Sequence, residues 1–158
     1  MTTKRRSPVF IGADHRGFEL KAEIMIFLKK LGHEVIDAGS YDVEPCDYPP
    51  IAYEVASQVA RLKKGRGILV CMSGIGHSIA ANKVPGAYAA LCYNKEAAIL
   101  SRQHNNANVL VLGSKFVARE EIFEIIKVWL STEFEGGRHL RRTRQIAAME
   151  KKLFKDFQ

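Results

Sequence analysis

Short apolar runs alternate with longer amphipathic segments along the chain, and the alternation repeats five times. The apolar runs predict buried strands, because most of their positions are hydrophobic. They occupy residues 9–13, 34–37, 67–71, 87–92 and 109–112. The segments between them carry apolar residues three and four positions apart, which predicts helices. These helices cover residues 18–31, 51–62, 78–83, 95–103 and 120–130, and a last one follows Gly136-Gly137 at about 138–157.

This pattern predicts an α/β protein with a single domain over residues 1–158. Apolar strands separated by helices favour a parallel sheet that is covered on both faces. Right-handed crossovers then give a three-layer αβα sandwich around a Rossmann-like, doubly wound, five-stranded sheet, and we expect the strand order 2-1-3-4-5. In this order the carboxyl ends of the first and third strands flank the crevice where ligands bind.

The composition is that of an ordinary globular domain, with 47% hydrophobic and 26% charged residues among 158. No apolar run approaches the roughly 20 residues of a membrane span, and no apolar stretch of a secretory signal follows the first residues. The three cysteines are an odd number without metal-ligand spacing. We therefore expect a cytoplasmic protein with reduced thiols, no membrane contact, no metal and no cofactor.

The formal net charge is +7, and much of the excess lies in Lys4-Arg5-Arg6 and between Arg138 and Lys155. Such runs often only solvate a surface, but they also attract phosphorylated substrates or nucleic acid. A basic α/β module that binds nucleotides or nucleic acid is the alternative from another class, and it would need aromatic residues between its basic residues as stacking platforms. Phe154 and Phe157 are the only candidates. Their spacing suits packing better, so we expect no nucleic-acid partner.

The segment from Gly67 to Lys83 carries the clearest chemical signal, because an apolar run there ends in Cys71 and continues as Ser73-Gly74-Ile75-Gly76 into a helix. Loop N–H groups and a helix N-terminus stabilise negative charge and lower the pKa of a thiol. Cys71 could therefore remove a proton while the loop holds the resulting oxyanion. The alternative is an inert buried thiol. The spacing matches neither a P-loop nor a dinucleotide-binding loop.

Two further polar pairs follow predicted elements. Asp14-His15 follows the first strand, where the pair could bind sugar hydroxyls or handle protons, or simply cap the next helix. His104-Asn105 lies in the turn before the fifth strand. We expect this turn, too, to lie on the carboxyl-end side of the sheet. There Asn105 could orient a carbonyl or ring oxygen, although Asn-rich turns are also common without a function.

The last helix carries Arg138 and Arg142 four positions apart, so both side chains lie on one face. Two guanidinium groups on one face suit a phosphate, although a solvated basic face is the simpler alternative. This helix also has more apolar surface than a peripheral helix needs. We therefore expect it to pack on a partner subunit.

Several motifs occur together in order along nearly the whole chain. They are Asp14-His15, Asp47-Tyr48-Pro49, Gly67-Ile-Leu-Val-Cys71, Ser73-Gly-Ile-Gly76, Ser78-Ile-Ala-Ala-Asn-Lys83, Ser101-Arg-Gln-His-Asn105, Ala107-Asn-Val-Leu110 and Phe134-Glu-Gly-Gly-Arg-His139. This ordered set resembles the ribose-5-phosphate isomerase B family, which also contains the galactose-6-phosphate isomerase subunits. The resemblance implies metal-independent interconversion of ribose 5-phosphate and ribulose 5-phosphate in the pentose phosphate pathway, by a homodimer or a dimer of dimers with sites built from both subunits.

The resemblance also implies roles for single residues. Cys71 matches the base that moves a proton between C2 and C1, Ser73 assists the oxyanion loop, and His104 matches the residue that opens the furanose ring. The matching substrate-binding positions are Asp14, His15, Tyr48, Met72, Gly74, Ile75, Gly76, Asn105, Lys115, Arg138 and Arg142.

The chain departs from the family pattern at several positions. Met72 stands where glycine is frequent, Lys115 where arginine is frequent and Tyr88 where an arginine is common. One branch of the family uses a glutamate at the position of His77 as its base. Here His77 is not acidic, so we expect it to face solvent at a helix N-terminus and Cys71 to be the base. A subunit of galactose-6-phosphate isomerase is the rival within the family, but that activity requires two different subunits.

Overall fold

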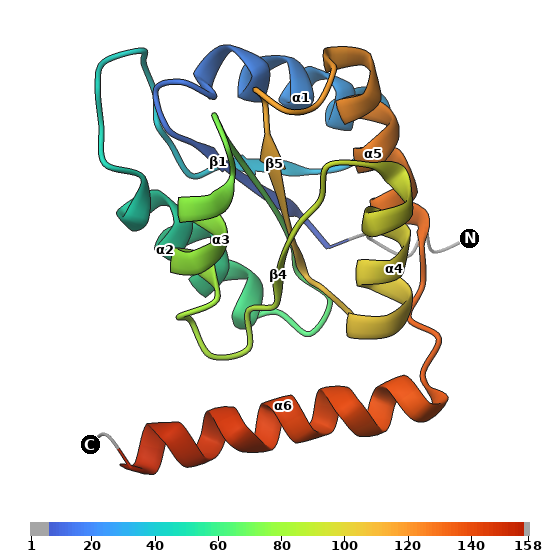
Figure 1. Ribbon diagram of the computed structural model, residues 1–158. Helices are drawn as coiled ribbons and strands as arrows, with labels where there is room; N and C mark the ends of the chain where they lie inside the picture. Colours follow the sequence, from blue (N-terminus) through green and yellow to red (C-terminus); the bar gives the residue numbers. More distant parts are fainter. Residues whose placement is uncertain (1–6, 157–158) are drawn as a thin grey trace.

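The computed structural model describes residues 7–156 as a parallel β-sheet with helices on both faces (Figure 1). The five strands are β1 Val9–Ala13, β2 Val35–Asp37, β3 Arg66–Cys71, β4 Ala89–Leu91 and β5 Val109–Gly113. All neighbouring strands pair in parallel. The predicted three-layer α/β class is therefore confirmed. Lys4, Arg5, Arg6 and Phe157, which entered the charge and stacking arguments, lie outside the described residues.

The helices that follow the strands are close to the predicted ones. They are α1 Phe18–Lys30, α2 Tyr48–Ala60, α3 Ile75–Ala81, α4 Lys95–Asn105, α5 Arg119–Ser131 and α6 Gly137–Asp156. The helix α2 begins three residues earlier than predicted, because Pro49 and Pro50 fall in its first turn, where a missing N–H costs nothing. This shift makes Tyr48 the first helical residue, directly after the N-cap residue Asp47.

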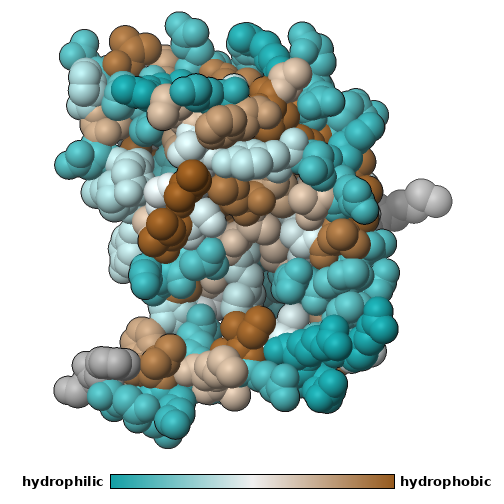
Figure 2. Space-filling view, in the orientation of Figure 1, coloured by the Kyte–Doolittle hydropathy of each residue, from teal (hydrophilic) through white to brown (hydrophobic). Residues whose placement is uncertain are grey.

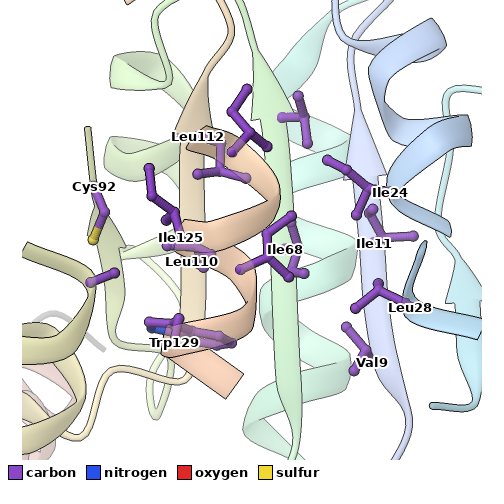
Figure 3. Packing of buried hydrophobic residues seen from close by; sticks show 14 of the residues in the cluster. Val9, Ile11, Ile24, Leu28, Ile68, Cys92, Leu110, Leu112, Ile125 and Trp129 are labelled. Carbon is purple, nitrogen blue, oxygen red and sulfur yellow. The ribbon is translucent and has the colours of Figure 1, made fainter. Parts of the chain in front are cut away.

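Two apolar layers hold the sheet between the helices. On one face α1 and α5 contribute Ile24, Leu28, Ile125 and Trp129, which pack against strand residues such as Ile11, Ile68 and Leu110 (Figure 3). On the other face α2 supplies Ala52, Val55 and Val59, and α3 supplies Ala81. These layers fix the ends of β1 and β3, from which the candidate site begins.

The predicted strand order is wrong at one edge, because the observed order is β2-β1-β3-β5-β4. The interior strand β5 is buried along its whole length and pairs with β3 through Gly67–Val109 to Cys71–Gly113. The strand β4 has only three residues, all of them half-buried, and pairs with β5 alone. The longer and more apolar strand therefore takes the interior position, and the short strand forms the edge.

The helix α6 lies along the lower edge of the molecule in Figure 1, below the sheet. Two hydrogen bonds are among the contacts between this segment and the rest of the chain. The Glu150 Oε1 accepts the Gly86 N–H at 3.0 Å, and the Glu135 N–H donates to the Gln103 carbonyl at 3.1 Å just before the helix begins. Tyr88, one of the departures from the family pattern, also lies against Glu150. Within the described residues, no helix has the length and hydrophobicity needed to cross a membrane.

Candidate active site

Cys71 is the last residue of β3, and its sulfur lies at the start of the loop that leads into α3. The side chain is 7% exposed, and its Sγ accepts the Gly74 N–H at 2.9 Å. Gly74 reaches this position with a φ of 84°, and a Cβ there would lie 2.4 Å from Leu91 Cδ1. The loop therefore requires glycine at this point, and its backbone turns an amide toward the sulfur.

The charge environment of the thiol combines opposing effects. Burial raises the pKa of Cys71, and the Asp14 carboxylate raises it further. The backbone N–H groups of Gly74, Ser73 and His77 lower this pKa. In a single chain burial is the largest of these effects, so the thiol is mainly protonated near pH 7. Any added positive charge at the sulfur would shift it toward the thiolate.

Asp14 and His15 lie at the carboxyl end of β1, beside the end of β3 as predicted. The Asp14 Oδ1 accepts the N–H groups of Arg16 and Gly17, each at 3.1 Å, which leaves the second oxygen of the buried carboxylate for other contacts. The His15 Nδ1 accepts the Cys46 N–H at 3.3 Å. Because Nδ1 accepts this bond, Nε2 is the ring nitrogen left to donate to another group.

Tyr48 approaches the loop from the start of α2. A Cβ at Gly76 would lie 2.5 Å from the Tyr48 ring, so the glycine is what lets the phenol pack against the loop. The rings of Tyr48 and His77 pack in a T-shaped arrangement, with 5.5 Å between their centroids and 72° between their planes. The expectation that His77 faces solvent is wrong, because this side chain is fully buried. Burial lowers the pKa of His77 to about 4, against a smaller opposite effect of Asp14, so the ring is neutral.

The remaining residues of the loop line its outer side. Met72 is 38% exposed, and its Sδ receives a hydrogen bond from the Arg16 guanidinium at 2.9 Å. The Ser73 Oγ accepts the Ile75 N–H at 3.3 Å, and Ile75 itself is exposed. The Lys115 N–H donates to the Met72 carbonyl at 2.9 Å, so this lysine also reaches the loop.

The second predicted group lies elsewhere in the same chain. His104 and Asn105 end α4, directly before β5, at the amino edge of the sheet. The expectation that this turn lies on the carboxyl-end side is therefore wrong, since a helix that returns before a parallel strand ends where that strand begins. Val109 and Gly113 are the two ends of β5, so four residues, or roughly 13 Å, separate the two edges of the sheet along this strand. Cys71 pairs with Gly113, at the far end.

Arg138 and Arg142 lie on α6, at the same edge as His104. The rings of His104 and His139 stack with centroids 4.1 Å apart and planes 8° apart. His139 Nε2 lies 3.5 Å from Glu135 Oε2. Burial lowers the pKa of His139, and the nearby His104 and Arg138 lower it further.

The nitrogen and oxygen atoms of His104, Glu135 and His139 lie within 4.8 Å of one another, the only such candidate set for a metal ion among residues 7–156. In parallel stacked rings the in-plane lone pairs do not converge on one point. The guanidinium groups of Arg138 and Arg142 also act on His139 and oppose a cation. This arrangement therefore suits an anion better than a metal ion.

The structure thus separates the predicted site residues into two groups. The loop group contains Cys71, Ser73, Asp14, His15, Tyr48, Met72, Gly74, Ile75, Gly76 and Lys115 at the carboxyl edge of the sheet. The helix group contains His104, Asn105, Arg138 and Arg142 at the amino edge. The sequence reasoning missed the contacts of Tyr93, whose hydroxyl donates to the Ser73 carbonyl at 2.9 Å, and of Arg16. No local pattern marks either residue.

Comparisons with known proteins agree with this architecture. The Ribose/Galactose Isomerase family matches residues 9–146. Ribose-5-phosphate isomerase B of Escherichia coli K12 is 46% identical over 144 residues, which are 91% of this chain and 97% of that protein. The Clostridium thermocellum ribose-5-phosphate isomerase B structure superposes with a TM-score of 0.88 at 47% identity and covers 92% of this chain and 99% of its own.

A structure of ribose-5-phosphate isomerase B from Mycoplasma genitalium, with bound ribulose-5-phosphate, also has a TM-score of 0.88. It is 44% identical and covers 91% of this chain and 96% of its own. At these identities the likeness covers the sequence as well as the fold.

Proposed function

Since this chain belongs to the Ribose/Galactose Isomerase family, we propose that it interconverts D-ribose 5-phosphate and D-ribulose 5-phosphate within the pentose phosphate pathway. The observation that carries this proposal is the Cys71 sulfur beside the N–H groups of a glycine-containing loop. An aldose–ketose isomerase needs one group that takes a proton and returns it, and donors for the oxyanion that forms in between.

The reaction assigned to this site moves one proton between neighbouring carbons. The Cys71 thiolate takes the proton from C2 of the open-chain aldose, and the electrons of that C–H bond form an enediolate. The N–H groups of the Met72–Gly76 loop and the Ser73 hydroxyl stabilise the negative oxygen. The proton of the O2 hydroxyl then moves to the neighbouring O1, and the Cys71 thiol returns its proton to C1, which gives the ketose. The step is balanced without a metal or an external oxidant.

The complete site requires a second copy of the chain. Within one chain the loop group and the helix group lie at opposite edges of the sheet, too far apart to hold one small sugar phosphate. In a homodimer the helix group of one copy would meet the loop group of the other. The positive guanidinium groups would then lower the pKa of Cys71 and favour the thiolate.

The exposed face of α6 supports this assembly. Arg138, Arg142, Met149 and Leu153 are spaced by four, seven and four residues, which places them on one side of the helix. Met149 and Leu153 are 64% and 55% exposed, and Ile75 and Ile79 of α3 are exposed as well. Figure 2 shows hydrophobic side chains over α3 and along α6 on the same face of the molecule. An apolar face of this kind favours association. If it packs on a second copy of the chain, both arginines are brought to the surface of that copy.

Within the assembled site each residue has a distinct task. His104 protonates the ring oxygen as the furanose opens. Asn105, Asp14 and His15 bind the sugar hydroxyls, and the His15 Nε2–H points away from its contact with Cys46. The phosphate binds Arg138 and Arg142, with Lys115 as an additional cation. Holding the phosphate orients C1 and C2 at the sulfur, so that binding energy far from the reacting carbons lowers the barrier.

The direct test is an isomerase assay of the purified protein in the presence of EDTA. We expect ribose 5-phosphate to be converted, and Cys71→Ala to abolish turnover while most substrate binding remains. Cys46→Ala is the matched control, because Cys46 is a more accessible thiol that lies outside the loop. A strict metal requirement, or full activity in Cys71→Ala, would refute the thiol mechanism.

A further inference from the structure

The amino edge of the sheet contains a cavity that the proposed reaction does not use. Its volume is about 620 Å³, and its walls include Val9 and Arg66, the first residues of β1 and β3. Small-molecule sites in proteins commonly have volumes of about 300–1,000 Å³. The cavity is therefore large enough for a metabolite the size of a nucleotide.

Positive charge dominates the lining. Lys64, Arg66 and Lys127 face one carboxylate, that of Glu133. Lys127 also lies 3.8 Å from Glu124 on its outer side, whereas Lys64 forms no ion pair within residues 7–156. Concave surfaces lined by one sign of charge concentrate the field and attract the opposite ion.

Arg66 is the best placed of these cations because two contacts hold its guanidinium group. It lies over the Trp129 ring, 5.8 Å from the centroid, and donates to the Gly65 carbonyl at 3.0 Å. A guanidinium group has five N–H donors, and the other donors of Arg66 have no acceptor in the described part of the chain. Burial lowers the pKa of Arg66, with a smaller opposite effect of Glu133, but arginine stays charged at neutral pH. An anionic ligand would satisfy these donors.

The rest of the lining adds an apolar wall, two hydroxyl groups and the His33 ring. Val9, Leu31 and Leu130 provide the apolar wall, and Ser7 and Ser131 provide the hydroxyls. A bare phosphate would leave the apolar wall unused, whereas a phosphate ester with a flat ring would cover it. We propose that this cavity is a second binding site, for a phosphorylated small molecule of nucleotide size.

This site is distinct from the one that contains Cys71. Arg66 and Cys71 are the two ends of β3, five residues apart, or roughly 16 Å along the strand. The helix group contributes none of the lining residues. The second site therefore does not depend on the proposed isomerase activity.

Trp129 is the only tryptophan of the chain, and the guanidinium groups of Arg66 and Arg102 both lie 5.8 Å from its ring centroid, so its fluorescence responds to a change at Arg66. We would titrate the full-length protein with adenosine 5′-monophosphate, inorganic phosphate and adenosine, with excitation at the red edge of the tryptophan band. The nucleotide should change the fluorescence saturably, phosphate should act only at higher concentration, and adenosine should have no effect. Equal affinity for phosphate and nucleotide would contradict a nucleotide-sized ligand, and no response to either would overturn the site altogether.

Charge variants separate this site from the active site. Lys64→Glu should weaken nucleotide binding about tenfold or more, since a hydrogen bond to a charged group is lost and a repulsive charge is added. Lys63→Glu is the matched control, because Lys63 is the exposed neighbour that does not line the cavity. Arg142→Ala should leave the binding unchanged, and Lys64→Glu should leave turnover of ribose 5-phosphate unchanged. Loss of nucleotide binding in Arg142→Ala instead would place the nucleotide in the active site and refute the proposal.

Discussion

The backbone N–H of Gly74 lies 2.9 Å from the Sγ of Cys71, and only a left-handed backbone conformation places it there. The thiol therefore lies at the end of a buried apolar strand, and the N–H groups of the following loop lower its pKa. The proposed role of the sulfur therefore depends on a glycine at position 74 as well as on the position of the strand end.

Gly74→Ala tests this connection. The new Cβ would meet Leu91 and would also be strained at the positive φ, so the amide should move away from the sulfur. We expect kcat to fall about tenfold or more, because one donor of the oxyanion loop is displaced. Gly32→Ala is the matched control: Gly32 has a φ of 79° with nothing within 4 Å of its Cβ position. It should cost about 1 kcal/mol of stability with normal kcat.

The pH dependence of Cys71 alkylation reports its protonation state. Burial raises the pKa of this thiol, so the thiolate fraction and the rate with iodoacetamide should still be rising above pH 8 in a single chain. In the assembled dimer the arginines of the second copy should move the profile to lower pH. Mass spectrometry in a Cys46→Ser background separates Cys71 from Cys92, whose pKa burial raises to about 11. Identical profiles for monomer and dimer would argue against arginines beside the sulfur.

His77 should make the protein sensitive to acid. Its folded pKa of about 4 lies below the ordinary value of 6.5, so the unfolded chain binds the proton more readily. Stability should be constant above about pH 6.5 and should fall as the pH decreases toward 4, by on the order of 3 kcal/mol from this residue. Urea unfolding of the wild type and of His77→Leu at several pH values measures the effect. A leucine variant with the same slope as the wild type would contradict it.

Met149→Glu should weaken the dimer, because it places a charge on the face of α6 that also carries Arg142. Analytical ultracentrifugation should show a dissociation constant at least tenfold higher, and isomerase activity should decrease upon dilution. Ala148→Glu adds the same charge at an exposed position on another side of the helix and should remain dimeric. If both variants remain fully associated, this face of α6 is not the interface.

Much of the fold could be predicted from the chain because strand and helix positions follow from local periodicity. Val109 to Leu112 and Gly67 to Cys71 are continuous apolar runs, and both form interior strands of the sheet. The exchange of β4 and β5 depends on length and burial within the sheet, since three half-buried residues around Ala90 cannot fill an interior position. Chain order alone does not contain that information.

The resemblance implied candidate site residues and a site built from two subunits, but the sequence did not show which of these residues lie together in one chain. The positions of Asp14 and Cys71 follow from the rule that parallel strands end at one edge. The position of His104 follows from the direction of α4, which places it at the other edge. The burial of His77 depends on Tyr48 packing against Gly76, a contact between segments far apart in sequence. Long-range packing of this kind leaves no local pattern.

The central claim is that one active site combines the Cys71 of one chain with the Arg142 of another, and mixed dimers test it most directly. Cys71→Ser and Arg142→Ala homodimers should each be nearly inactive toward ribose 5-phosphate. After the two variants are unfolded together and refolded, half of the dimers contain one site in which both residues are intact. Activity should then recover to about a quarter of the wild-type value. Activity that stays at the level of the parent variants, in a sample shown to contain mixed dimers, would contradict a site shared between two chains.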